Sequence, residues 1–178
     1  MSTKQEIVEA FARRIERAGY DRTNLDDIAA ELHISKKTIY VHFDGKRDIY
    51  AELVTRRAAR DKMRLAAAVA TLPTYVARVE AHVTMLLGMA RDHIKATGRE
   101  EWLREYEIAA DAFRQAHGEL LRELIAAGME AGEFATGDAV FAERMVAAML
   151  LDYTRMVNED PSVDRDAELV RRIIRFLT

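Results

Sequence analysis

The chain has 178 residues, of which 49% are hydrophobic and 32% charged, a composition that excludes a disordered tail and predicts a folded globular protein. It contains no cysteine, which excludes disulfide scaffolds, thiolate metal sites and cysteine nucleophiles. The net charge of −3 provides no general attraction to nucleic acid, so a nucleic-acid site would depend on local clusters of positive charge.

Residues that enter a helix at little cost dominate the sequence. Ala, Leu, Arg and Glu are frequent, and only two prolines and eight glycines interrupt them, so we expect an all-α fold. No apolar run approaches the roughly 20 residues that span a bilayer, and the first residues lack the apolar core of a signal peptide. We therefore expect a cytoplasmic protein without a membrane partner.

Three short helices are predicted in the N-terminal part of the chain. Apolar residues at helical spacing predict a first helix that ends at Gly19. Asn24 is a favourable N-cap for a second helix that reaches about Leu32. Ser35 is a natural N-cap for a third helix that reaches about Phe43.

The helices that follow are longer. No helix breaker occurs over 46–70, which predicts a fourth helix of roughly six turns. Pro73 suits the first turn of a fifth helix that ends near Gly98. Beyond it we expect a short or irregular segment at 102–106 and further helices at about 112–131, 138–158 and 163–177.

Residues 24–43 have the spacing of a helix-turn-helix, in which two short helices are joined by a turn of three or four residues. The second helix carries donors and aromatic groups suited to phosphates and base edges, while Ile39 and Phe43 face inward. Between residues 33 and 47 there are four Lys and Arg side chains and only one acidic side chain, Asp44. The alternative is that the two lysines of this helix are ordinary surface residues. This local positive charge favours DNA binding.

Residues 5–55 resemble the N-terminal signature of the TetR (tetracycline-repressor) family of transcriptional regulators. The resemblance rests on a glycine–aromatic pair, a capped short helix, a Ser-capped recognition helix and a Tyr-x-x-Phe ending, carried by Gly19, Thr23, Ile28, Ala29, Ser35, Thr38, Tyr40, Phe43, Lys46 and Tyr50. It implies a three-helix DNA-binding domain (1–50) and a larger helical ligand-binding and dimerisation domain (51–178), with the boundary inside the fourth helix. It also implies a regulator, expected to be a repressor.

The resemblance implies DNA contacts from positions on and beside the second motif helix: Thr23, Asn24, Ser35, Lys36, Lys37, Thr38, Tyr40, His42 and Lys46. Thr38, Tyr40 and His42 are expected at phosphates, and Lys36 and Lys37 at base edges or neighbouring phosphates. The lysine that begins the fourth helix lies beside exposed amide groups, which also suit a phosphate.

Two positions depart from the family's pattern. His33 stands in the turn where a glycine is usual, and a non-glycine residue at positive φ is costlier. Asn24 replaces a commoner threonine but caps a helix equally well. Lys37 occupies a variable position, where a lysine favours guanine contacts.

A homodimer on a palindromic operator is expected, because one recognition helix reads only a few base pairs and two helices about 34 Å apart reach successive major grooves. The last two helices have apolar faces with small residues at Ala147 and Ala148, and the resemblance implies that they pair with their symmetry mates. The alternative is burial of these faces within one subunit.

Control by a small-molecule effector is implied by the resemblance alone, since no specific motif follows residue 55. Methionines and aromatics adapt to apolar ligands, so the apolar candidates for a pocket are Met85, Met89, Trp102, Tyr106, Phe113, Met145, Met149 and Tyr153. The candidates for a polar contact are Asp152, which interrupts an apolar stretch, and Arg78, His82 and His93 on the fifth helix. The alternative for most of these residues is ordinary core packing or surface exposure.

Other functions receive little support from the residue pattern. No histidine or carboxylate cluster has metal-ligand spacing, and no convergent set of titratable groups predicts catalysis. We expect no metal, no cofactor and no enzymatic activity. The second hypothesis is a DNA-binding protein controlled by a protein partner or by assembly on DNA, which a closed, fully packed C-terminal domain would favour.

Overall fold

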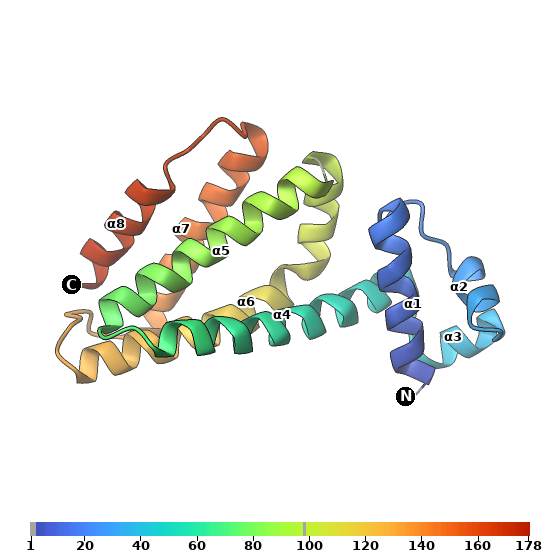
Figure 1. The fold of residues 1–178 in the computed structure, drawn as a ribbon, viewed down its shortest axis with the longest axis horizontal. Coiled ribbons are helices and arrows are strands. Elements are labelled where there is room, and N and C mark those ends of the chain that lie inside the picture. The colour runs from blue at the N-terminus through green and yellow to red at the C-terminus, as the bar shows by residue number, and fades with distance from the viewer. Residues whose placement is uncertain (1–2, 98) are drawn as a thin grey trace.

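A computed structural model describes the backbone of residues 3–97 and 99–178, and the side chains of these residues except 97–107 and 109–113. The described chain is built of helices without a strand, which confirms the all-α class (Figure 1). Among the described residues, no helix combines the length and the apolar character needed to cross a membrane. The helices are α1 (Thr3–Ala18), α2 (Leu25–Glu31), α3 (Lys36–His42), α4 (Lys46–Ala70), α5 (Tyr75–Thr97), α6 (Arg99–Glu130), α7 (Ala139–Glu159) and α8 (Asp166–Leu177).

The first three helices pack with the start of α4 around a small apolar core at one end of the molecule (Figure 1). Its centre is formed by Ile7, Phe11, Ile28, Ile39 and Ile49, all fully buried. These side chains come from four different helices. Their removal from water therefore stabilises one arrangement of α1, α2 and α3 relative to α4.

The predicted limits of the first four helices agree with the structure within a residue or two. α1 ends before Gly19, whose φ of 80° lies in the left-handed region that glycine adopts without strain. The side chains of Asn24 and Ser35 cap α2 and α3, as expected. α4 then runs unbroken for 25 residues, since no glycine or proline interrupts it.

The helix α4 belongs to two hydrophobic cores. Near its start, Ile49 and Leu53 are buried with α1, α2 and α3. Near its end, Leu65 and Val69 are buried in the larger core formed with the later helices. An unbroken helix of this length spans roughly 37 Å, at 1.5 Å for each residue, and connects the two units without a flexible linker.

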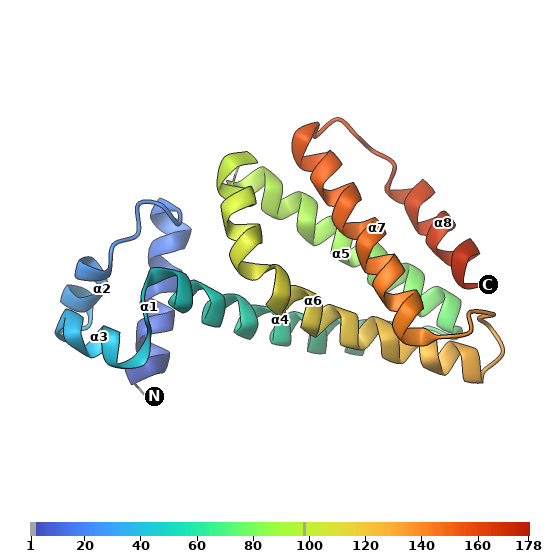
Figure 2. The same ribbon diagram turned by 180° about the vertical axis from the view of Figure 1, so that it is seen from behind.

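In the larger unit α5 and α6 pack against α4, α7 packs against α5 and α6, and α8 packs against α5, so that α5 contacts all four of the other helices (Figures 1 and 2). Val79, Val83, Ile125, Val146 and Ile173 are fully buried in its core. Helices α7 and α8 both lie on the part of this unit that is farther from α2 and α3 (Figure 2). One face of each therefore packs inward and the other faces solvent.

The prediction of a short or irregular segment at 102–106 was wrong. These residues lie within α6, which begins at Arg99 rather than near residue 112 and runs for 32 residues. The stretch 99–113 contains neither glycine nor proline and is rich in Glu, Arg and Ala, which favour a continuous helix. The charged and aromatic residues clustered in this stretch obscure the regular helical spacing of apolar residues, and the prediction of helices depended on that spacing.

Two predicted helix starts were displaced. Pro73 precedes α5, which begins at Tyr75, instead of standing in its first turn. The last helix begins at Asp166 rather than at Val163. Here Asp160 accepts hydrogen bonds from both the amide and the hydroxyl of Ser162, a local arrangement that holds the chain in a turn before α8.

The larger core contains two buried histidines. His82 of α5 is fully buried, and His117 of α6 is 3% exposed, with ring centroids 6.2 Å apart. The backbone of His117 lies near His82, yet no hydrogen bond of normal geometry reaches either ring nitrogen of His82 from a described residue. Burial first, and then the neighbouring charge of His117 for His82 and of Lys62 for His117, together lower the pKa of both histidines to about 4. Both imidazoles are therefore neutral at pH 7.

The variant His82→Leu is expected to unfold at a higher urea concentration than the original protein at pH 7.5, because an uncompensated polar group in the core costs about 1–3 kcal/mol. It is also expected to depend less on pH. An unfolded histidine gains a proton below about pH 6.5, whereas His82 stays neutral down to about pH 4, so stability present above pH 6.5 is lost as the pH falls through this window.

Urea unfolding at fixed protein concentration and at pH 7.5, 6.5, 5.5 and 4.5 measures this effect. His93→Leu is the matched control, because His93 is an exposed histidine on the same helix. An equal loss of stability with falling pH in the original protein and in His82→Leu would show that His82 does not contribute to it.

Candidate nucleic-acid interface

Helices α2 and α3 are joined by a tight turn that brings them together as a helix-turn-helix. The amide of His33 donates to the carbonyl of Ala30, and the amide of Ile34 donates to the carbonyl of Ala29. His33 has a φ of 53°, so the residue that stands where the family usually has glycine does adopt the left-handed conformation. The turn is formed despite the cost that a side chain adds there.

Side-chain caps fix where the two motif helices begin. The Asn24 side-chain oxygen accepts from the amide of Asp26 at 3.0 Å, and the Ser35 hydroxyl accepts from the amide of Thr38 at 3.1 Å. The hydroxyls of Ser35 and Thr38 are also hydrogen-bonded at 2.8 Å. These local bonds fix the residue at which α3 begins, and thereby which of its side chains face outward.

The face of α3 that points away from the protein is defined by its buried face. Ile39 is fully buried, and successive residues of a helix are rotated by about 100°. Lys37 and Val41, two positions before and after Ile39, therefore both lie about 160° from it and point outward. Lys36 and Tyr40 lie on one flank of this outer face, and Thr38 and His42 on the other.

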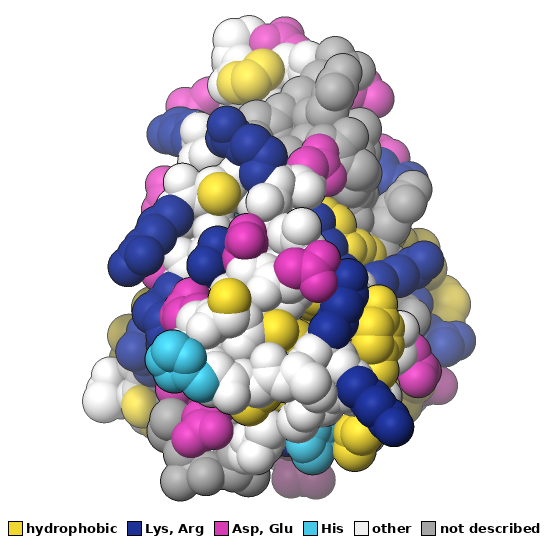
Figure 3. Space-filling model, turned by 90° about the vertical axis from the view of Figure 1, so that its right-hand side faces the viewer, with side chains coloured by type: hydrophobic (Ala, Val, Ile, Leu, Met, Phe, Trp, Pro, Cys, Tyr) yellow, Lys and Arg dark blue, Asp and Glu magenta, His cyan; other side chains and the backbone are white. Residues whose placement is uncertain are grey.

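The exposed fractions agree with this arrangement. Tyr40 is 51% exposed and Val41 is 72% exposed, whereas Thr38 and His42 are half-buried at the edge of the motif. Figure 3 looks onto the end of the molecule that carries α2 and α3, where Lys and Arg side chains lie around the face with acidic side chains between them. The positive charge predicted from the sequence is therefore present at the surface, but it is not continuous.

One of the two lysines of α3 is already paired. The Lys36 ammonium donates to the Asp26 carboxylate at 2.9 Å, and this hydrogen bond raises the pKa of Lys36. Within the described part of the chain, Lys37 has no ion-pair partner. Lys37, at the centre of the outer face, is therefore the lysine of α3 that can contact DNA without breaking an existing ion pair.

Lys46 at the start of α4 is half-buried. Its ammonium donates to the Asp21 carbonyl at 3.1 Å and lies 4.3 Å from the ring centroid of Tyr20, so it holds α4 against the loop before α2. Gly45 precedes α4 and provides no side-chain cap, which leaves first-turn amides of this helix without that partner. Arg47 is exposed beside them and was missed as a site residue by the sequence interpretation, although its charge was counted.

Thr23 does not share the exposed face with the other predicted DNA contacts. It is 4% exposed, and its hydroxyl donates to the Gly19 carbonyl at 2.8 Å. The side chain therefore fastens the loop between α1 and α2 and is not accessible to a phosphate. Val41, in contrast, was not among the predicted contacts, and its exposure became visible only with the helix in place.

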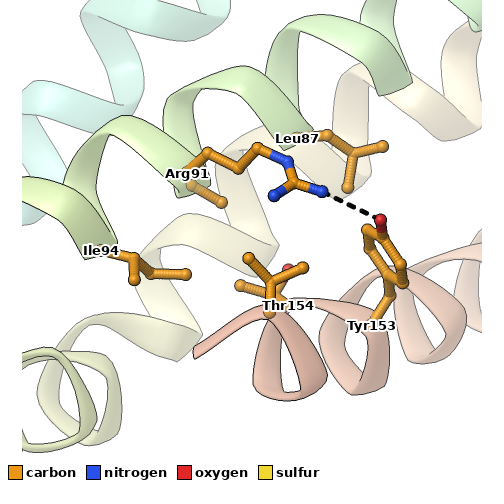
Figure 4. A pocket seen from close by; sticks show the side chains of 7 residues that line it. Leu87, Arg91, Ile94, Tyr153 and Thr154 are labelled. Carbon is orange, nitrogen blue, oxygen red and sulfur yellow. Dashed lines mark hydrogen bonds between the residues drawn. The ribbon is translucent and has the colours of Figure 1, made fainter. Parts of the chain in front are cut away.

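The predicted pocket residues of the larger unit do not converge on one cavity. Met85, Met145 and Asp152 are exposed, Met89 and Met149 are half-buried against the core, and Tyr153 is buried. The side chains of Trp102, Tyr106 and Phe113 lie outside the described residues. A cavity among the described side chains measures about 10 Å³ and is lined by Leu87, Ala90, Arg91, Ile94, Tyr153, Thr154 and Val157 (Figure 4). This is about the room that one water molecule needs.

A half-buried ion pair lies at one side of this cavity. Arg91 of α5 donates two hydrogen bonds to the Asp166 carboxylate, at 2.6 and 2.8 Å, and a third at 3.0 Å to the Tyr153 hydroxyl (Figure 4). The Tyr153 hydroxyl in turn donates to Asp166 at 2.6 Å. The guanidinium holds the pKa of the Asp166 carboxyl below its usual value. This network joins α5 and α7 to the first residue of α8.

Comparisons with known proteins agree with this geometry. Residues 4–53 match the family model described as bacterial regulatory proteins, tetR family. The chain is 41% identical over 51 residues to the biofilm operon icaADBC HTH-type negative transcriptional regulator IcaR of Staphylococcus aureus (strain Newman). This match covers 29% of the chain and 27% of IcaR, so it spans about a quarter of the relative's length.

Solved structures with the same fold cover almost the whole chain. The fatty acid degradation regulator FadR from Bacillus halodurans is 22% identical, with a TM-score of 0.67 over 99% of this chain and 94% of FadR. RolR in complex with the ligand resorcinol is 16% identical, with a TM-score of 0.80 over 98% of this chain and 87% of RolR. At these identities the likeness shows that the helical architecture is shared beyond the N-terminal residues.

Substitutions of His33 test whether the motif turn is strained. A left-handed conformation costs an L-residue about 1–2 kcal/mol, whereas glycine adopts it freely at an entropic cost of about 0.5–1 kcal/mol on folding. We expect His33→Gly to unfold at an equal or slightly higher temperature than the original protein. His33→Val is expected to be less stable by at least about 1 kcal/mol, since β-branched residues avoid positive φ.

Thermal unfolding followed by circular dichroism provides the measurement for both variants. His33 is exposed, so neither substitution removes core packing. A valine variant as stable as the original would mean that the turn relaxes out of the left-handed region.

Proposed function

Because this chain belongs, through its N-terminal domain, to the tetR family of bacterial regulatory proteins, we propose that it is a transcriptional repressor released from DNA by a small molecule. In this proposal it binds a palindromic operator as a homodimer. The observation that carries the DNA-binding part is the outward face of α3, which presents Lys37, Tyr40 and Val41 to solvent beside exposed cationic side chains. Repression is supported by the relative IcaR, a negative transcriptional regulator.

The proposed DNA contacts divide into base and phosphate contacts. The helix α3 enters the major groove, where Lys37 reaches a base edge at the centre of the outer face. Tyr40, Thr38 and His42 lie on the flanks of α3 and are positioned for phosphates, together with Ser35 and Asn24 at the helix starts. The start of α4, with Lys46 and the exposed Arg47, is suited to a further phosphate because amide groups and positive charge meet there.

The homodimer is proposed to form through α7 and α8. Exposed apolar side chains follow one face of α7 at helical spacing, and one more is found on α8: Phe141, Met145, Met156 and Phe176. Ala148 lies on the same exposed face of α7, where a small side chain permits close helix contact. A second copy of this chain would remove these groups from water, and a two-fold axis would present two α3 helices to one DNA duplex.

The effector is proposed to bind in the larger unit, residues 51–178, among α5, α6 and α7. The buried imidazole of His82 supports this location, since a polar ligand would satisfy ring nitrogens that have no hydrogen bond of normal geometry to a described residue. A ligand larger than one water molecule would have to enlarge the cavity of about 10 Å³ between α5 and α7 to occupy it. Resorcinol in RolR is an example of a small polar aromatic ligand in a protein of this fold.

Movement of α4 would link the effector to DNA. α4 packs along α6, and Ile108 of α6 also packs against the core of the N-terminal unit, so α6 contacts both parts. A ligand that shifts α6 and tilts α4 changes the separation of the two α3 helices in the dimer. A coupling of about 1–3 kcal/mol weakens operator binding roughly 5- to 150-fold, without a large rearrangement.

A second candidate function is control by a protein partner or by assembly on DNA. The observation that favours it is the small cavity of about 10 Å³ among the described side chains of α5 and α7. The two functions differ in one measurable respect. Only the first predicts a small molecule that raises the unfolding temperature and lowers DNA affinity together.

Binding of the purified protein to its own upstream intergenic DNA, measured against random DNA at two salt concentrations, tests DNA recognition. We expect sequence-selective binding that weakens steeply as salt rises, because phosphate contacts release counterions. Equal affinity for both DNAs would direct the search to operators selected from a random pool. Absence of any enriched sequence from that pool would contradict the proposal.

Tyr40→Ala and Lys37→Ala are expected to weaken operator binding by about tenfold or more, since each removes a DNA contact in both subunits. Lys95→Ala is the matched control, because Lys95 is an exposed lysine on α5. Sedimentation should show an unchanged dimer for all three variants. Loss of the dimer in Tyr40→Ala or Lys37→Ala would mean that these residues serve assembly instead.

The double variant Phe141→Glu, Met145→Glu is expected to be a folded monomer, because a second copy would have to bury four added carboxylates at its interface. Analytical ultracentrifugation and circular dichroism measure assembly and folding separately. Met63→Glu is the control, since Met63 is a 66%-exposed methionine on α4. A dimer that persists in the double variant would place the interface elsewhere.

A further inference from the structure

We infer that Val41 is a specificity-determining residue that reads the C5-methyl group of a thymine in each half of the operator. The inference rests on the proposed DNA-binding function and deepens it by naming a base. It starts from an apolar side chain in an unusual place. Val41 is 72% exposed on a seven-residue helix whose other solvent-facing side chains are all polar or aromatic.

Local structure does not explain a valine at this position. Valine is a weaker helix former than alanine or lysine, and the exposed side chain contributes little to the core that Ile39 and Phe43 form beneath it. A single exposed apolar residue is ordinary on a protein surface. Val41, however, occupies one of the two positions that lie most directly opposite the buried face of α3, where a helix in the major groove approaches the bases.

The charged side chains around Val41 are suited to contact with DNA and not to contact with an apolar partner. Lys37 lies one turn before it on the same outer face, Lys36 and Tyr40 flank that face, and Arg47 is exposed at the start of α4. A protein partner that covered Val41 would have to bury these charges as well, whereas DNA phosphates neutralise them. The chemical group in the major groove that suits a buried valine side chain is the thymine methyl, since the other base edges are polar.

Helix geometry limits where the thymine lies. Lys37 and Val41 are four residues apart, a distance of about 6 Å along the axis of α3. Base pairs are stacked about 3.4 Å apart along each strand. The base pair read by Val41 is therefore at most two positions from the base pair read by Lys37.

Replacement of single thymines by deoxyuridine tests this directly, because deoxyuridine differs only by the missing methyl group. The operator is first selected from a random DNA pool with the full-length protein. Each thymine is then replaced symmetrically in both half-sites, and affinities are measured for the original protein, Val41→Ala and Lys37→Ala. Loss of one buried methyl corresponds to about a fourfold weaker half-site, and so to about 15-fold for a symmetric operator.

We expect one thymine in each half-site at which deoxyuridine weakens the original protein about 15-fold and leaves Val41→Ala unaffected. Lys37→Ala should bind more weakly but keep its sensitivity to deoxyuridine at that thymine. Val41→Ala should fold normally, since the position is exposed and alanine favours a helix.

Three results would overturn the inference while leaving DNA recognition intact. The operator could show no deoxyuridine-sensitive thymine, the same thymine could remain equally sensitive in Val41→Ala, or the sensitive thymine could lie more than two base pairs from the position at which Lys37→Ala loses discrimination. Failure to select any operator is a different outcome, since it contradicts the proposed function itself.

Discussion

The structure depends on one constraint, the continuity of α4 through two separate hydrophobic cores. Ile49 and Leu53 bury the start of this helix with α1, α2 and α3, and Leu65 and Val69 bury its end among the helices of the larger unit. Because no glycine or proline interrupts the 25 residues, neither core can rotate alone without bending the helix. A change of packing in the larger unit is therefore transmitted to the position of α3.

The candidate DNA interface is assembled from local interactions and not from the overall charge. Although the chain carries a net charge of −3, caps at Asn24 and Ser35 and a left-handed His33 orient α3 so that Lys37 and Val41 point away from the core. The pairing of Lys36 with Asp26 leaves fewer available cations than a count of lysines suggests. Specific side chains at the centre of α3 thus matter more than total positive charge.

The larger unit combines a tightly packed core with polar groups that are costly to bury. Arg91, Tyr153 and Asp166 satisfy one another in a network that links α5, α7 and α8. His82, in contrast, is buried without a hydrogen bond to a described residue. The first arrangement favours a single packing of the helices, whereas the second reduces the stability of that packing and is the kind of deficit that a bound polar ligand would relieve.

The sequence by itself determined the all-α class, the caps of α2 and α3 and the family resemblance, because these depend on residues close together in the chain. Only the tertiary structure decided that Thr23 is buried, that Lys36 is paired, that His33 adopts a left-handed conformation and that Val41 is exposed. It also decided that Arg91 meets Asp166, 75 residues away. These outcomes depend on which helix faces are brought together, and a periodic pattern identifies an apolar face without specifying its partner.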